Sequence, residues 1–80
     1  MRLFKYRKLV KLGKATYKDL CDADEKFTLL QSQGSDAEAD RYYHYTIRLA
    51  NEIYALVSVA WLVFGVDTTK FTLKIGMGGE

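Results

Sequence analysis

The residues best placed for acid–base chemistry are Asp40, His44 and Arg48, which recur every four positions. On a helix this spacing puts the three side chains on one side, where Asp40 could orient or charge the imidazole. The same spacing is typical of ordinary charge pairs on a helix surface, each worth about 0.2–0.5 kcal/mol. Because the sequence indicates no nucleophile, oxyanion hole or pocket beside them, we predict that the chain is not an enzyme.

Cysteine and metal chemistry have little support. The chain has one cysteine, Cys21, and one histidine, His44, whereas zinc sites usually need three or four nitrogen or sulfur ligands. Cys21 follows Leu20 on the apolar side of the first predicted helix, so we expect a buried, inert thiol. The glycine-containing tail KIGMGGE lacks the spacing of a phosphate-binding loop. We therefore predict no catalytic residue, no metal and no cofactor.

The segment RYYHYTIR, residues 41–48, is the strongest candidate for a partner contact. At about 100° per residue, Arg41, His44 and Arg48 gather on the solvent side of a helix. Tyr45 lies at the edge of the apolar stripe, with its hydroxyl able to reach water. Tyrosine and arginine are over-represented at the energetic centres of interfaces. We predict a protein contact at these four residues; the alternative is a solvated helix face.

Two long helices are expected to carry these residues. Apolar residues recur at steps of three and four, which predicts a helix over about residues 15–31 and another over about residues 35–64. The first helix could begin near Leu3 or only after Gly13, because glycine inside a helix costs about 1 kcal/mol relative to alanine. We predict that the two helices form an antiparallel pair in a mostly α fold.

The ends of these helices are marked by the sequence around them. Gly34 suits the C-terminal end of the first helix, and Gly65 suits the end of the second. Ser35 and Glu38 form an S-x-x-E capping box, in which each side chain accepts the other's backbone N–H. This pattern predicts that the second helix begins at Ser35.

The C-terminal tail alternates apolar with polar or glycine positions, which predicts a short strand over about residues 70–77. The alternating apolar residues are Phe71, Leu73, Ile75 and Met77. A lone strand is not stable. A β-α-α-β arrangement is therefore the alternative fold, with Arg2–Val10 as an N-terminal strand that pairs with the tail.

The end of the second predicted helix is apolar on every side. Its residues Val59, Trp61, Leu62, Val63 and Phe64 are the predicted oligomer interface. One hairpin partner covers only one side of such a helix, and a chain of 80 residues buries too little surface to be more than marginally stable alone. We predict a homodimer in which two hairpins form a helical bundle.

Charge is strongly segregated along the chain. Residues 1–18 contain seven Lys or Arg and no acidic residue, residues 19–40 contain seven Asp or Glu and one Lys, and residues 41–80 are nearly balanced. Interleaved basic and aromatic residues indicate a sequence-independent contact to nucleic acid as one use of the first segment. The predicted basic patch consists of Arg2, Lys5, Arg7, Lys8, Lys11 and Lys14.

Length and composition favour one small domain over residues 1–80. The single cysteine and the charged N-terminus, which lacks a signal-peptide pattern, predict a cytoplasmic protein. We expect a small non-catalytic protein that acts by protein–protein binding, as an adaptor or inhibitor. In size and composition it is similar to small phage- or plasmid-encoded modulators of host systems, anti-CRISPR inhibitors among them. The alternatives are a nucleic-acid-binding accessory protein and, third, a peripheral membrane protein.

Overall fold

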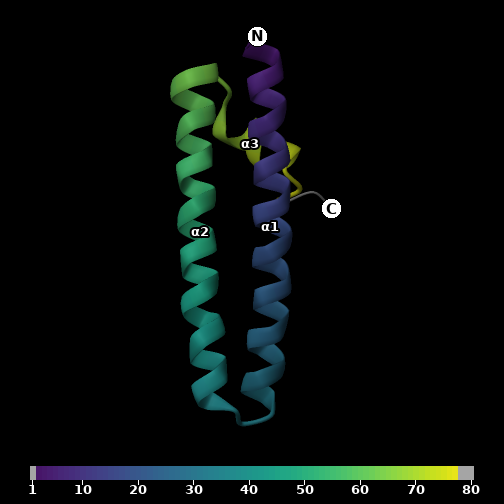
Figure 1. The fold of residues 1–80 in the computed structure, drawn as a ribbon, viewed down its shortest axis with the longest axis vertical. Helices are drawn as coiled ribbons and strands as arrows, with labels where there is room; N and C mark the ends of the chain where they lie inside the picture. The colour runs from purple at the N-terminus through teal and green to yellow at the C-terminus, as the bar shows by residue number, and fades with distance from the viewer. Residues whose placement is uncertain (1, 78–80) are drawn as a thin grey trace.

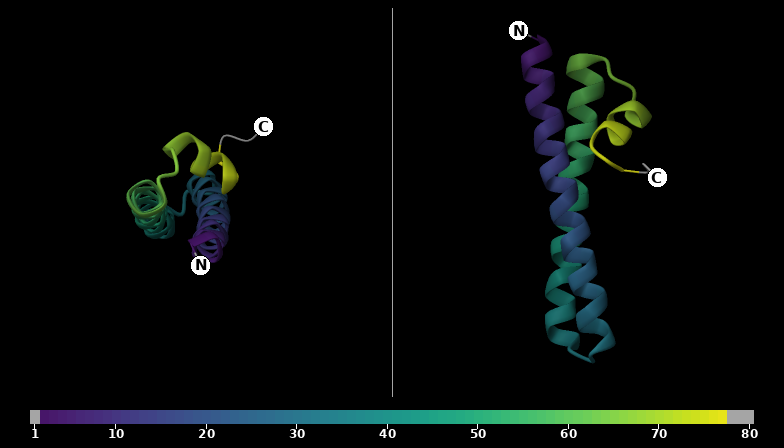
Figure 2. Two further views of the ribbon diagram at one scale, coloured as in Figure 1. Left: turned by 90° about the horizontal axis from the view of Figure 1, so that it is seen from above. Right: turned by 90° about the vertical axis from the view of Figure 1, so that its right-hand side faces the viewer.

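Two long helices lie side by side and antiparallel, and a short third helix folds back against one face of the pair (Figure 1, Figure 2). This computed structural model describes residues 2–77, with side chains from residue 4 onward. The helices are α1 (Arg2–Ser32), α2 (Asp36–Phe64) and α3 (Thr68–Lys74). The described chain measures 49 × 23 × 17 Å and contains no strand. The predicted antiparallel helix pair is confirmed.

The first helix begins much earlier than about residue 15, and the alternative N-terminal strand Arg2–Val10 is wrong. Helix α1 runs without a break from Arg2 through Gly13. Gly13 is buried beneath α3, where a Cβ atom would lie 2.6 Å from Cγ2 of Ile75. The glycine therefore allows the close approach of α3, which offsets its unfavourable helix propensity.

The predicted C-terminal strand at residues 70–77 is also wrong, because Thr68–Lys74 is helical. Phe71 and Ile75 are four residues apart, so in a helix they share one face, and both are buried. Leu73 lies on the other side and is exposed. The backbone N–H of Ile75 donates to the oxygen of Phe71 at 3.1 Å, as helical geometry requires. Because the N-terminal segment is itself helical, it offers the tail no strand to pair with.

The ends of α2 lie where the sequence predicts them, although one predicted contact is missing. Ser35 is the N-cap residue, but its side chain makes no capping hydrogen bond, so the hydrogen-bonded capping box is wrong. At the other end Gly65 has a φ of 65° in the left-handed region. Its N–H donates to the oxygen of Trp61 at 3.0 Å, and the N–H of Val66 donates to that of Ala60 at 3.0 Å. This is the hydrogen-bonding pattern of a glycine-terminated helix.

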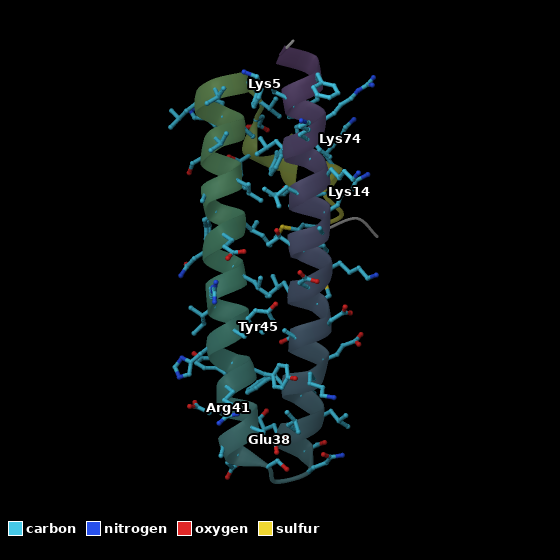
Figure 3. The ribbon with its side chains drawn as sticks, in the orientation of Figure 1. Lys5, Lys14, Glu38, Arg41, Tyr45 and Lys74 are labelled. Carbon is cyan, nitrogen blue, oxygen red and sulfur yellow. The ribbon has the colours of Figure 1, made fainter. Side chains whose placement is uncertain are left out.

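The hairpin separates charge between its two ends. The basic N-terminal part of α1 lies beside the end of α2, whereas the acidic residues 19–40 lie on both sides of the turn between the helices. Figure 3 shows Lys14 and Lys74 in the half of the molecule near the N-terminus and Glu38 near the turn. The molecule is therefore a rod with a basic end and an acidic end.

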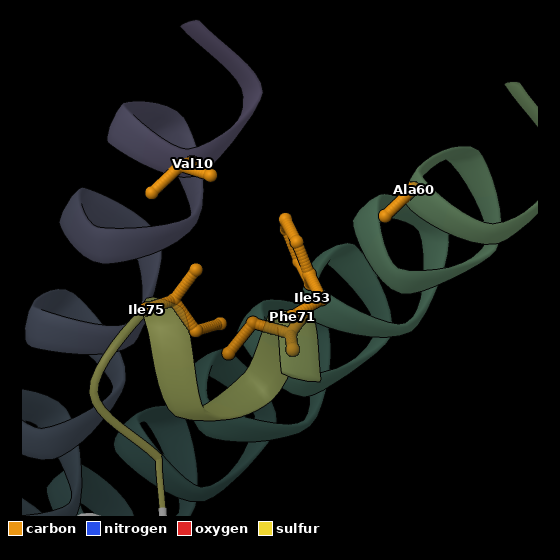
Figure 4. Close-up of a cluster of buried hydrophobic side chains, with 5 residues drawn as sticks. All are labelled: Val10, Ile53, Ala60, Phe71 and Ile75. Atoms are coloured by element: carbon orange, nitrogen blue, oxygen red, sulfur yellow. The ribbon is translucent and has the colours of Figure 1, made fainter. Parts of the chain in front are cut away.

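All three helices contribute to the main core, which lies in the basic half of the rod (Figure 4). Phe71 is completely buried and is the largest side chain of which this is true. It packs in a cluster whose buried members are Val10, Ile53, Ala60, Phe71 and Ile75. Nearer the turn, buried apolar residues of α1 pack directly against those of α2, and α3 does not cover them. Their buried members are Ala23, Leu30, Ala39 and Leu49.

Candidate binding surfaces

Helix α3 converts part of the predicted basic patch into a hollow lined by cations from two helices. The hollow has a volume of about 270 Å³. Its lining residues are Tyr6, Arg7, Val10, Lys11, Lys14 and Lys74. Among the residues that the structure describes, no carboxylate lines it, and Tyr6 is held in place by its ring contacts with Phe64 and Phe71, at centroid distances of 5.5 and 6.5 Å. We call Arg7, Lys11, Lys14 and Lys74 the basic cluster.

The structure brings together three of the six residues predicted for the basic patch. Lys5 points toward α2, while Lys14 and Lys74 point to the other side of α1 (Figure 3). The Lys8 ammonium instead lies 4.8 Å from the ring centroid of Phe4. The side chain of Arg2 lies outside the described residues.

Sequence reasoning missed two lysines of α3. Lys74 lines the basic cluster, and Lys70 joins it in a neighbouring hollow of about 340 Å³. Asp67 is the one acidic residue at that second hollow. The four-residue spacing of Lys70 and Lys74 is a signal for a shared helical face, but it has meaning only once the tail is known to be helical.

The positive charge of the basic cluster is not balanced by ion pairs in the described part of the chain. The ion pairs found there join His44 Nε2 to Asp40 Oδ2 at 3.4 Å and Arg48 Nε to Glu52 Oε1 at 3.7 Å. Both pairs lie on α2, within one helix, and are well exposed. Within the described residues, the basic cluster therefore presents positive charge to solvent without an ion-pair partner.

The side chains of the partner patch predicted within RYYHYTIR have two kinds of local contact. His44 and Arg48 form the exposed pairs with carboxylates on their own helix, an arrangement typical of a solvated helix surface. Arg41 and Tyr45 instead border a shallow hollow of about 330 Å³, together with Glu38 and Tyr42. Because the four residues are three or four positions apart on one helix, they are still neighbours on its surface, and the protein contact stays a prediction.

The last turns of α2 expose large apolar side chains in several directions. Leu62 is 78% exposed, Trp61 56%, Val63 51% and Val59 39%. Phe64 differs from them because it is half-buried and packs against the ring of Tyr6. We call Val59, Trp61, Leu62 and Val63 the apolar end of α2. Phe64 belongs to the edge of the core instead.

Helix α2 is also long and apolar enough, by length and composition, to cross a membrane. It contains an 18-residue window that meets this condition, and only 17% of that window is buried within the structure. Among the described residues it is the one helix with this property. Much of its apolar surface is thus left uncovered by α1 and α3.

Cys21 is exposed rather than buried, so the expectation of a buried thiol is wrong. It lines a groove between α1 and α2, in a part of that face that α3 does not cover. A hydrogen bond with Cys21, then the charge of its thiolate and slight desolvation, raise the pKa of the Tyr17 phenol. The helix turns Cys21 outward because it lies one position beyond Leu20, which contacts the core.

We expect Cys21 of the native protein to react with a maleimide at a rate within about tenfold of the rate in denaturant, because an exposed thiol is limited by its ionisation rather than by burial. Mass spectrometry of samples quenched over time measures both rates. Labelling that is slower in the native protein by several orders of magnitude would show that the thiol is covered, for example by a second chain.

Within the described residues, no group of three or more His, Cys, Asp or Glu side chains is placed to hold a metal ion. No family model matches the chain, and no curated protein and no solved structure is significantly similar to it. The functional conclusion therefore depends on the surfaces themselves.

Proposed function

We propose that this chain is a small non-catalytic binding protein that acts as an adaptor or inhibitor by covering part of a partner protein. The apolar end of α2 is the observation that supports this proposal most strongly. Surface apolar residues are usually scattered singly, whereas a contiguous exposed patch marks an interaction site. A phage- or plasmid-type modulator of a host system, such as an anti-CRISPR-like inhibitor, would need no catalytic centre to act in this way.

The directions of these side chains suggest two contacts rather than one. Trp61, Leu62 and Val63 are consecutive, so they project about 100° apart around the helix. A flat partner surface covers neighbouring directions but not all three. A second copy of this chain against one side and a different protein against another would bury the whole end, which combines the predicted homodimer with an adaptor or inhibitor role.

The test is capture of a partner by tagged protein from a lysate of the organism that encodes the chain. We expect Leu62→Glu to abolish capture of a partner that the unmodified chain retains, because a buried unpaired carboxylate is strongly unfavourable at an apolar interface. The matched control is Asn51→Glu, which adds the same charge at another exposed position of α2. Equal capture by both variants, or no specific capture by the unmodified chain, would refute the proposal.

Sedimentation of the same three proteins separates self-association from binding to another protein. A dimer of the unmodified chain that dissociates in Leu62→Glu and persists in Asn51→Glu assigns the apolar end to a homodimer. A monomer at all concentrations, with partner capture retained, assigns it to the other protein alone.

Membrane attachment is the second candidate, favoured by the uncovered membrane-length window of α2. A peripheral mode would place the apolar end and the nearby lysines against anionic lipids. Flotation with lipid vesicles tests it. Stable flotation that Leu62→Glu removes and Asn51→Glu retains would favour the membrane over a protein partner.

A further inference from the structure

Cations follow one line along the side of α1. Arg7, Lys11, Lys14 and Lys18 are separated by four, three and four residues, which is the spacing of a single helical face. All four are exposed. At about 1.5 Å per residue the line extends over about 16 Å. It is therefore an extended basic track rather than a point site.

Helix α3 widens this track at its N-terminal half. Lys74 reaches the hollow lined by Arg7, Lys11 and Lys14, and Lys70 lies one turn earlier on α3. The hollow has an apolar floor of Tyr6 and Val10, so its cations stand around a recess. Asp67 is the carboxylate that the structure places beside Lys70 and Lys74, in the neighbouring hollow. Like charges held this close repel one another, and an anionic ligand with several charges would remove that repulsion.

The track belongs to α1 and α3. Figure 3 shows Lys14 of α1 and Lys74 of α3 on the side of the molecule away from α2. The large exposed side chains Trp61 and Leu62 belong to α2. A bilayer contact needs apolar and basic groups on one surface, whereas a phosphate backbone needs mainly a line of cations. The extended line of cations therefore favours the phosphate backbone of a nucleic acid over a lipid surface.

We propose that the face formed by α1 and α3 binds the phosphate backbone of a nucleic acid without sequence preference. Binding there is a further function, independent of the apolar end of α2. Four phosphate contacts from the basic cluster correspond to a slope of about −3.6 in log affinity against log salt for duplex DNA. That slope amounts to roughly a 150-fold loss of affinity between about 50 and about 200 mM salt.

The test measures fluorescence anisotropy of a labelled duplex DNA of mixed sequence. We expect the double variant Lys14→Gln and Lys74→Gln to bind at least about tenfold more weakly at about 50 mM salt and to halve the slope to about −1.8. Lys26→Gln is compared with Lys14→Gln alone as its matched control, because each removes one positive charge from an exposed position of α1, Lys26 from the acidic half. Circular dichroism confirms that each variant is folded.

Several results would overturn the proposal. One is the absence of DNA binding by the unmodified chain at about 50 mM salt. Another is an equal loss of affinity in Lys26→Gln, which would indicate a diffuse charge effect rather than a defined face. Binding to phosphatidylglycerol vesicles without binding to DNA would assign the face to a lipid headgroup and also reject the nucleic acid.

Discussion

Phe71→Ala is expected to lower the free energy of unfolding by about 3–5 kcal/mol, as truncation of a buried phenylalanine generally does. Phe71 is completely buried, and it joins α3 to both long helices through the cluster that includes Val10, Ile53 and Ala60. The core of so small a domain rarely supplies more than about 3–5 kcal/mol in total. We therefore expect the variant to be largely unfolded in water, as measured by urea denaturation followed by circular dichroism.

Leu73→Ala is the matched control because it removes a large apolar side chain from the same short helix. Leu73 is 53% exposed, and a substitution at such a surface position usually changes stability by less than about 0.5 kcal/mol. In a strand, Phe71 and Leu73 would share one face, so truncating either would matter similarly. Comparable losses from the two substitutions would contradict the helical assignment of the tail.

The long helices were predictable because their pattern repeats many times. Residues of α2 from Ala39 to Ala60 alternate steps of three and four through several turns, and no other regular structure satisfies that spacing. The short tail offers only four apolar residues. Phe71 and Ile75 satisfy a helix, and the same two residues together with Leu73 also satisfy a strand. The choice between helix and strand depends on the surface of α1 against which the tail packs. The spacing of apolar residues within the tail contains no information about that surface.

The sequence predicted which residue types form the candidate surfaces better than it predicted which residues come together there. The lysines of α1 are visible as a basic segment, since they are close in the sequence. Lys74 joins them only because the chain turns back at Gly65 and α3 packs over Gly13. Cys21 shows a related limit, because one position along a helix is about 100° of rotation. A residue next to the apolar stripe can therefore face solvent.

Gly13→Ala is expected to destabilise the unmodified protein and to stabilise a variant in which Ile75 is shortened to alanine. In the unmodified chain the new methyl group would lie 2.6 Å from Cγ2 of Ile75 and 3.4 Å from the Phe71 ring. Overpacking of this kind costs about 1–3 kcal/mol, which exceeds the gain of about 1 kcal/mol from replacing glycine in a helix. In the Ile75→Ala background the obstructing methyl group is gone, so the same substitution should stabilise the protein by up to about 1 kcal/mol.

Urea denaturation of the four proteins in this cycle measures the coupling, which we expect to be about 1–3 kcal/mol in favour of the double variant. Ile75→Ala alone should cost about 2–5 kcal/mol, because Ile75 is buried in the core, so the four proteins are compared in a stabilising osmolyte that keeps this variant folded. Additive effects would show that α3 does not pack over Gly13.

The same four proteins also test the DNA-binding face. A Gly13→Ala protein that displaces α3 moves Lys74 away from Arg7, Lys11 and Lys14. It should then bind DNA more weakly even though no cation has been removed, and the Ile75→Ala background should restore that binding.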